Sequence, residues 1–380
     1  MTNNNENKVL NVPNLRFPEF SGEWIDETLG NIAKIVGGGT PDTNIQKYWN
    51  GNIQWFTPSE IGRNKYVTYS LRTISEEGLN KSSAKFLPIG TILLSSRATV
   101  GECSINNMEC TTNQGFQSLI AKDNFSNEFL FYLIQTKRKE LIRKACGSTF
   151  LEISANEVRK IKITVPTRKE QEKISKLLAL LDERIATQNK IIEKLQSLIK
   201  GIAQHCIKES TSGNTYVKLG DICQITTGKL DANAQVDNGI YPFFTCAEQP
   251  FKIDSFAFDT EALLISGNGA NLGYINYYKG KFNAYQRTYV LDLFSENIQY
   301  IKWALKVLLP KRIAIEKSSS NTPYIVLSTL TDLRLPIPCK SKQSFIANLM
   351  QSLERKLSNQ IAQYDSYNYL KQYLLRQMFI

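Results

Sequence analysis

The sequence predicts an α+β protein with two related α/β domains, each followed by a long helix, and the two helices packed as an antiparallel coiled coil. Three observations lead to this prediction. Sequence landmarks recur in the same order in the two halves of the chain, which indicates an internal repeat. Short apolar runs bounded by turn residues indicate strands in each copy. Each copy then ends in a stretch with heptad periodicity.

The internal repeat is clearest at the start of each long helix. Gln171 and Gln343 lie 172 positions apart, and the same shift places Pro166 on Pro338. Upstream, "LGNIAKI" resembles "LGDICQI", "TILLSSRATVG" resembles "EALLISGNGANLG", and "TNQGFQSL" resembles "AYQRTYVL". Several blocks in the same order favour a duplicated plan over chance similarity.

Within each domain, local patterns predict the elements. The runs "TILLSS" and "EALLIS" read as strands, and "IKITVP" and "LRLPIP" read as strands that stop at proline. A shorter helix follows the middle strands, with Ser126 and Ser295 as the expected N-caps. We expect the Asn-rich N-terminus to be disordered, because it has too little apolar surface to bury. The expected segments are the tail 1–13, the first domain 14–166, the first long helix 167–208, a linker 209–216, the second domain 217–338 and the second long helix 339–380.

The heptad frame of the first helix places Ile174, Leu181, Gln188, Leu195 and Ile202 at position d and Leu178, Ile185, Ile192, Ile199 and Cys206 at position a. In the second helix, d holds Ile346, Leu353, Gln360, Tyr367 and Leu374, and a holds Met350, Leu357, Tyr364, Lys371 and Met378. Each apolar seam needs a partner, and the other helix is the simplest one. Antiparallel pairing would bring Gln188 and Gln360 together, where a polar pair can fix the register. The alternative is that both glutamines are solvated beside a loosened seam.

Composition limits the possible functions. The chain has 46 Lys and Arg against 35 Asp and Glu, a net charge of +11, which favours a polyanionic partner such as nucleic acid. One histidine and seven cysteines without a C-x-x-C pair disfavour a zinc site and histidine-based catalysis. Scattered thiols in odd number are typical of a reducing cytoplasm. No run of eighteen apolar residues occurs, so we expect no membrane span.

These features together carry a family resemblance. The two-copy plan, "VPTRKEQEKISKLLALLDERI" at 165–185, "ILLSSRATVG" with "NQGFQSL", and "PNLRFPEFSGEW" at 13–24 resemble the specificity subunit of a Type I restriction-modification system. The resemblance covers essentially the whole chain. The second copy departs from it at Lys342, where the first copy has Glu170, so the two helices need not contact a partner equally.

The resemblance implies a non-catalytic, cytoplasmic subunit that reads double-stranded DNA. Its two globular parts would be target recognition domains for a bipartite sequence with a fixed gap. The implied partners are methyltransferase subunits, expected to be two in number, and restriction or translocase subunits are left open. S-adenosylmethionine would belong to the methyltransferase, so this chain would hold no cofactor and no metal.

DNA recognition uses cationic groups for phosphate, amides and guanidinium groups for base edges, and glycines where the backbone approaches closely. In the first domain the candidates are Gly38, Gly39, Thr40, Trp55, Thr57, Ser59, Arg63, Lys65, Ser95, Ser96, Arg97 and Gln114. In the second domain they are Thr227, Gly228, Lys229, Asn268, Gln286, Arg287, Ser319, Ser320 and Asn321. Each of them can instead belong to a turn or a solvated surface, and Trp55 suits a core better than a stacking platform.

Two other functions fit parts of the sequence. "GNGANLG" at 267–273 and "NTPY" at 321–324 suggest an N6-adenine or cytosine-N4 DNA methyltransferase, although Thr322 stands where such enzymes have a proline. A lone glycine-rich loop is a weak signal. The other alternative is a coiled-coil scaffold, which predicts no binding to duplex DNA.

Overall fold

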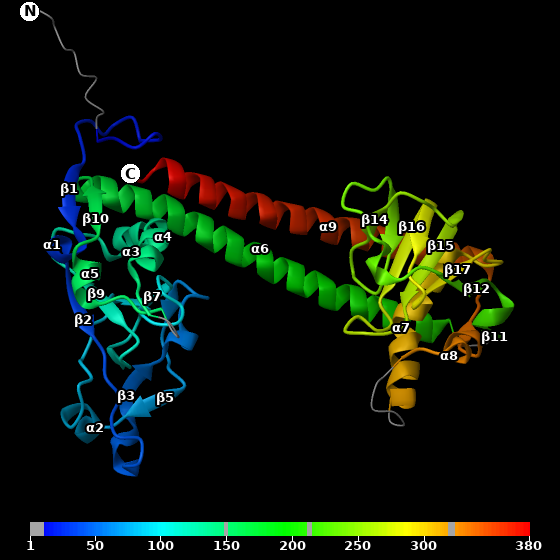
Figure 1. The fold of residues 1–380 in the computed structure, drawn as a ribbon, viewed down its shortest axis with the longest axis horizontal. Coiled ribbons are helices and arrows are strands. Elements are labelled where there is room, and N and C mark those ends of the chain that lie inside the picture. The colour runs from blue at the N-terminus through cyan, green and yellow to red at the C-terminus, as the bar shows by residue number, and fades with distance from the viewer. Residues whose placement is uncertain (1–10, 148–150, 211–214, 318–323) are drawn as a thin grey trace, which may run out of the picture. The chain divides into compact units, whose positions relative to one another are not determined.

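The computed structural model describes residues 11–147, 151–210, 215–317 and 324–380 (Figure 1). They form two compact units, one comprising Met1–Thr187 with Tyr364–Ile380 and the other Gln188–Gln363. The two long helices, α6 (Arg168–Glu209) and α9 (Lys340–Gln377), each contribute residues to both units. Each unit therefore combines a globular domain with the start of one long helix and the end of the other.

The described residues of the first unit form three sheets. β1 (Ile25–Thr28) pairs with β10 (Lys162–Val165), so that the two ends of the first domain meet. The central sheet has the order β2-β9-β6-β7-β4, from Ala33–Gly37, Gln117–Ala121, Ile92–Leu94, Cys103–Asn106 and Tyr66–Val67. The outer sheet has the order β5-β3-β8, from Arg72–Ile74, Trp49–Phe56 and Cys110–Thr112. The short helices are α1 (Leu29–Ile32), η1 (Gln46–Tyr48), η2 (Pro58–Glu60), α2 (Glu76–Asn80), α3 (Asn127–Thr136), α4 (Arg138–Lys144) and α5 (Ala155–Arg159).

The second unit repeats this plan with a larger sheet. β11 (Tyr216–Lys218) pairs with β18 (Arg334–Pro336), as β1 pairs with β10. The main sheet has the order β12-β17-β15-β16-β13-β14, from Gln224–Thr227, Thr288–Asp292, Phe258–Ser266, Ile275–Ala284, Tyr241–Phe244 and Phe251–Ile253. The helices are η3 (Leu219–Asp221), η4 (Ala232–Ala234), α7 (Ile298–Lys317) and α8 (Leu327–Thr331). The predicted strands "TILLSS", "EALLIS", "IKITVP" and "LRLPIP" are β6, β15, β10 and β18.

A buried glutamine marks the same place in both copies. Gln171 accepts a hydrogen bond from Ser126 N at 2.9 Å and donates one to Pro166 O at 2.9 Å. Gln343 likewise donates to Pro338 O at 2.9 Å, five residues before it. Because these buried backbone groups would otherwise lack a partner, each glutamine ties the start of its long helix to its domain.

The shorter helices begin at slightly different places. The side chain of Ser126 accepts a hydrogen bond from Phe129 N and caps α3, as predicted. The prediction that Ser295 caps α7 is wrong. Asn297 caps α7 instead, since its side chain accepts from the backbone N of Gln299 and Tyr300, and Gln343 accepts from Asn297 N at 3.0 Å. Asn is as good an N-cap as Ser, so the sequence signal alone did not separate the two positions.

The long helices pack antiparallel. In the first unit, Ile174 and Leu178 near the start of α6 share a core with Leu374 and Met378 at the end of α9. In the second unit the roles reverse, and the late α6 residues Leu195 and Ile199 pack with the early α9 residues Ile346 and Met350. Every predicted a and d position in both helices is buried or half-buried, which confirms the heptad frame. Each buried Leu or Ile side chain contributes about 1.5–3 kcal/mol.

Several expected segments lie partly outside the described residues. Of the predicted tail 1–13, residues 1–10 are not described, and the Asn11 carbonyl accepts a hydrogen bond from Trp24 N at 2.7 Å. The linker 209–216 includes the undescribed residues 211–214. Among the helices of the described chain, none combines the length and apolarity needed to cross a membrane.

Candidate nucleic-acid interface

In the first domain, the glycine loop after β2 lies against the turn that contains Gln114. Gly39 N donates to Thr112 O at 2.8 Å, and a Cβ at Gly38 would clash with the Asn113 carbonyl oxygen. Glycine at this position therefore permits a close approach between two backbone segments. As a result, the Thr40 hydroxyl donates to Gln114 Oε1 at 2.5 Å. Both side chains are exposed, so they are available to a ligand.

Two further predicted segments meet the same turn. Asn113 N donates to Phe56 O at 3.0 Å, and a Cβ at Gly115 would lie 2.9 Å from Pro58, so the segment 57–59 borders the turn. On another side, Ser96 N donates to Gly115 O at 2.8 Å. Four segments that are far apart in the sequence thus converge on Gln114. We call these segments, 38–40, 57–59, 95–97 and 113–115, the first loop cluster.

Arg97 is presented by a tight loop. The Ser95 hydroxyl donates to Arg97 O at 3.1 Å and lies 2.9 Å from the Thr99 hydroxyl. Ala98 follows with φ 63°, a left-handed conformation that costs energy for a residue with a side chain. The exposed Arg97 guanidinium lies 3.9 Å from the Glu152 carboxylate. Ser95 and Ser96 are themselves buried, so they shape the loop and do not face a ligand.

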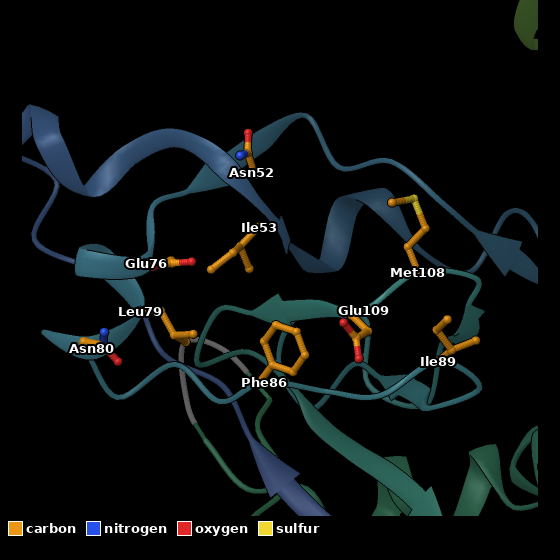
Figure 2. Close-up of a pocket in the computed structure, with 9 residues that line it drawn as sticks. All are labelled: Asn52, Ile53, Glu76, Leu79, Asn80, Phe86, Ile89, Met108 and Glu109. Carbon is orange, nitrogen blue, oxygen red and sulfur yellow. The ribbon is translucent and has the colours of Figure 1, made fainter.

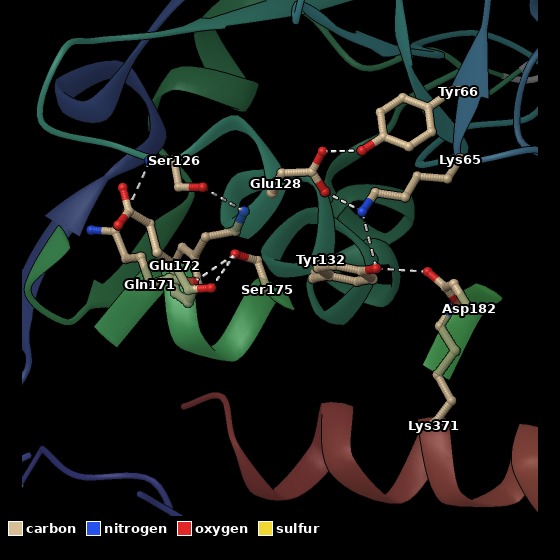
Figure 3. Close-up of polar contacts among 11 residues, drawn as sticks. Lys65, Tyr66, Ser126, Glu128, Tyr132, Gln171, Glu172, Ser175, Asp182 and Lys371 are labelled. Carbon is tan, nitrogen blue, oxygen red and sulfur yellow. Dashed lines mark hydrogen bonds and ion pairs between the residues drawn. The ribbon is translucent and has the colours of Figure 1, made fainter. Parts of the chain in front are cut away.

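Two other predicted residues support the domain. Trp55 is 4% exposed, packs edge to face on Trp49 with ring centroids 5.1 Å apart, and donates from its indole nitrogen to Gly39 O at 2.9 Å. It therefore holds the glycine loop and offers no stacking platform. Lys65 is paired with Glu128 and donates to the Tyr132 hydroxyl at 3.2 Å (Figure 3). Arg63, in contrast, is exposed.

The second domain repeats the arrangement. Gly228 follows β12 as Gly38 follows β2, and a Cβ there would clash with the Ala284 carbonyl oxygen. Gln286 N donates to Leu230 O at 2.9 Å, which brings the predicted segment 227–229 beside Gln286. Gly267 N donates to Arg287 O at 2.8 Å, so Asn268, the next residue, lies beside the turn at 285–287. We call 227–229, 267–268 and 285–287 the second loop cluster.

Sequence reasoning missed one neighbour in each domain. The Cys246 thiol donates to Asn268 Oδ1 at 3.1 Å, and Asn271 donates to Cys246 O at 3.0 Å, so the turn at 245–248 borders the second cluster. In the first domain, Ser83 lies against Gly39. Neither segment has a recognisable motif, and only the pairing of distant loops reveals them. The predicted residues Ser319, Ser320 and Asn321 lie outside the described residues.

The first domain also has an open groove of about 640 Å³ (Figure 2). Five apolar side chains and two carboxylates are among its lining residues, which are Asn52, Ile53, Glu76, Leu79, Asn80, Phe86, Ile89, Met108 and Glu109. The carboxylates disfavour phosphate, and no predicted DNA-binding residue lines the groove. In the described part of the chain, no group of three or more His, Cys, Asp or Glu side chains is placed to hold a metal ion.

The glycine-rich stretch 267–273 joins β15 to the antiparallel β16. A nucleotide-binding glycine loop instead leads from a strand into a helix. The methyltransferase alternative therefore loses the support of this stretch. The first three residues of "NTPY" lie outside the described residues.

The outward faces of the long helices carry apolar side chains that the seam does not cover. The exposed large apolar residues on α6 are Leu180, Ile191 and Leu198, and on α9 they are Phe345, Ile361, Tyr369, Leu370 and Tyr373.

Known proteins resemble the chain over part or most of its length. The Type I restriction enzyme MjaIX specificity subunit of Methanocaldococcus jannaschii is 29% identical over 381 residues, covering 89% of this chain and 88% of that protein. The EcoDI specificity subunit of Escherichia coli is 44% identical over 137 residues, 36% of this chain and 30% of that protein. The crystal structure of a Type I restriction-modification S subunit from M. genitalium has the same fold, with a TM-score of 0.64, 18% identity and coverage of 97% of this chain and 99% of that one.

The duplication is also visible in the family match. The Type I restriction modification DNA specificity domain matches twice, at residues 21–197 and 211–364. Each match spans one globular domain and most of the long helix that follows it. These two matches cover most of the sequence, and the chain belongs to the family of Type I restriction modification DNA specificity domains.

Proposed function

We propose that this chain is the DNA-reading subunit of a Type I restriction-modification complex and binds a bipartite target with its two loop clusters. One observation carries the proposal: the same kind of exposed polar loop cluster occurs at the same place in both copies of the repeat. In each copy a glycine loop after the first sheet strand lies against a turn that carries an exposed glutamine, Gln114 or Gln286.

The side chains in these clusters suit base recognition. A glutamine can form two hydrogen bonds with adenine, and an arginine can form two with guanine. Gln114 with Arg97 in the first cluster, and Gln286 with Arg287 in the second, would supply these groups. Thr40 and Lys229 would contact phosphate and fix the orientation of the domain on the duplex.

Two recognition domains in one chain imply a target in two parts. The distance between the half-sites then follows from the protein, as it does for dimeric repressors. The long helices would set the gap, so insertion of one heptad in both of them would lengthen it.

The chemistry would belong to partner subunits. The exposed apolar faces of α6 and α9 would dock methyltransferase subunits, and the duplicated plan suggests two of them. The methyltransferase would supply S-adenosylmethionine, and a restriction subunit would join the same assembly. The complex would work in the cytoplasm, where its substrate is chromosomal and incoming DNA.

Methylome sequencing of cells with and without the gene tests this function. We expect a bipartite methylation motif with a fixed gap that disappears when the gene is deleted and returns when it is restored. Persistence of every methylated motif in the deletion strain would contradict the proposal. Loss of a short uninterrupted motif would contradict the bipartite part alone.

A further inference from the structure

A closed polar network joins the first domain to both long helices. Figure 3 shows the Tyr132 hydroxyl between two partners: it accepts from Lys65 Nζ at 3.2 Å and donates to Asp182 Oδ2 at 2.7 Å. Glu128 pairs with Lys65 and also accepts from the Tyr66 hydroxyl. On the other side, Asp182 Oδ1 pairs with Lys371 Nζ at 2.6 Å.

Tyr132 at the centre of the network is buried, and the charges around it balance. Tyr132 is 0% exposed, and the Lys65 and Lys371 side chains are 12% and 19% exposed. Both ammonium groups also lie over the Tyr132 ring, 4.7 Å and 5.8 Å from its centroid. Burial raises the pKa of Tyr132, and the hydrogen bond to Asp182 raises it further, so the hydroxyl keeps its proton and remains a donor. Two lysines face two carboxylates, which lowers the cost of enclosing them.

The network is a second polar attachment of the domain to its helix. Gln171 provides the first, and Asp182 follows eleven residues later on α6. Eleven residues of α-helix span about 16 Å. Between these two polar contacts, Ile174 and Leu178 of α6 pack in the core of the first domain. The network adds a directional contact at the far end of that apolar contact, which restricts tilting of the domain about it. Lys65 extends the attachment to the start of β4, and Lys371 extends it to α9.

The other copy has a related attachment at the same place. Glu354 also follows its glutamine, Gln343, by eleven residues. Its carboxylate binds Lys302 at 2.8 Å and Lys306 at 3.1 Å, both on α7, which corresponds to α3. An acidic residue at this position of the long helix thus holds the domain helix in both units, with different partners. The recurrence argues that the attachment serves the shared function and is not an accident of one surface.

We propose that Lys65, Tyr132 and Asp182 are positioning residues that fix the tilt of the first domain on the helix pair and thereby restrict the gap between half-sites that the protein accepts. This inference rests on the proposed function. Lys65, which the sequence placed among the DNA contacts, acts through Tyr132 and not on phosphate. Loosening the network would leave each loop cluster intact but let the first domain reach half-sites at the wrong spacing.

The test uses the full chain assembled with its methyltransferase subunits and duplexes carrying the bipartite motif found in the methylome. The gap is kept native or changed by one base pair in either direction. Tyr132→Phe and Asp182→Asn each remove one part of the network with little change in volume. We expect both variants to bind the native duplex nearly as well as wild type. Their preference for the native gap should fall about fivefold, roughly the factor that one net hydrogen bond is worth.

A salt titration separates positioning from phosphate contact. Lys65→Gln should leave the slope of log affinity against log salt unchanged, whereas loss of a phosphate contact would reduce the slope by about one. Arg63→Gln, at an exposed position near Lys65, is the matched comparison. An unchanged gap preference in both Tyr132→Phe and Asp182→Asn, or a reduced salt slope in Lys65→Gln, would overturn the positioning role. A wild-type complex that binds scrambled duplexes equally well would instead overturn the proposed function.

Discussion

Gln188 in α6 donates from its side-chain nitrogen to both the backbone oxygen and the side-chain oxygen of Gln360 in α9, each at 2.9 Å. Gln188 is 5% exposed and interrupts a seam of isoleucine and leucine. The prediction that these two glutamines meet in the antiparallel pair is therefore confirmed. A shift of either helix by one heptad would place each glutamine against apolar side chains, so the pair favours one register at some cost in stability.

Replacing both glutamines with leucine should stabilise the second unit. In Gln188→Leu/Gln360→Leu, apolar contacts replace a buried polar pair, and we expect a gain of about 1 kcal/mol, or about 2–4 °C in Tm for a unit of this size. Calorimetry measures the change, and the two single variants complete a double-mutant cycle. Gln196→Leu, at an exposed position of α6, is the control. A double variant that melts below wild type would show that the glutamine pair is net stabilising.

Gln171→Ala should destabilise the first unit by at least about 2 kcal/mol, because it leaves the buried Ser126 N–H and the Pro166 carbonyl without their partner. Gln343→Ala should destabilise the second unit by a similar amount, because Asn297 N and Pro338 O would lose their hydrogen-bond partner. Urea denaturation followed by far-UV circular dichroism measures both losses. Gln204→Ala, exposed on α6, should change stability by less than about 0.5 kcal/mol. Equal effects of Gln171→Ala and Gln204→Ala would refute the role of the buried glutamine.

Arg97→Ala should weaken binding to the specific duplex by about 1–3 kcal/mol and relax base preference at one position, if its guanidinium reads a base. Binding of the reconstituted complex to single-base variants of the target measures this loss. Arg63→Ala should weaken binding to all duplexes equally if that side chain contacts only phosphate. Arg184→Ala, exposed on α6 and outside the loop clusters, is the control. An Arg97→Ala complex with unaltered affinity and base preference would remove Arg97 from the interface.

Exchanging residues 14–150 for the same region of a relative should change one half of the target and leave the other half and the gap as they were. The physical reason is that each loop cluster is built entirely within its own domain. The methylation motif of a strain carrying the hybrid gene gives the answer. A hybrid in which both half-sites change would contradict two independent recognition domains.

Acid should weaken the attachment of α7 to α9. Burial alone would raise the pKa of Glu354, but the Lys302 hydrogen bond and the Lys306 and Lys302 charges outweigh it and hold the pKa below its usual value of 4.5. A carboxylate with a lowered folded-state pKa adds stability above its unfolded-state pKa, and this stability is lost as the pH falls through the folded-state value. The difference in stability between wild type and Glu354→Gln should therefore shrink from pH 7 to pH 3.5. A difference that stays constant over this range would exclude ionisation of Glu354 as the cause.

Much of the fold follows from local pattern. Heptad periodicity depends only on spacing along one chain segment, so the a and d positions, the seam and its interruption at Gln188 could be read directly. The order of repeated blocks likewise indicated the duplicated plan, whereas the convergence of the loops came from the structure alone. The segments at Gly38 and Gly228 were singled out because each follows a repeated block, "LGNIAKI" or "LGDICQI", and because glycine lets the backbone approach a phosphate closely.

Side-chain roles inside the domains were harder to predict. Ser95 and Ser96 have suitable chemistry for DNA contact, yet they are buried by segments far away in the sequence. Trp55 is buried too, as the sequence favoured. Lys65 has the same charge as Arg63, two residues before it, but only Lys65 faces Glu128 and Tyr132 of α3. Asn297 and not the predicted Ser295 caps α7, because Gln343 of the long helix accepts a hydrogen bond from Asn297 N and holds it in place.

By itself, the sequence determined that the chain is duplicated, that each copy ends in a long amphipathic helix, and that a glutamine interrupts each seam at the same heptad position. Tertiary structure alone decided which polar side chains face solvent at the loop clusters and which ones attach the domains to their helices. The physical reason is one of range. Periodicity and turn chemistry act between neighbours in the chain, whereas burial and ion pairing at Lys65, Tyr132, Asp182 and Lys371 depend on four elements that only folding brings together.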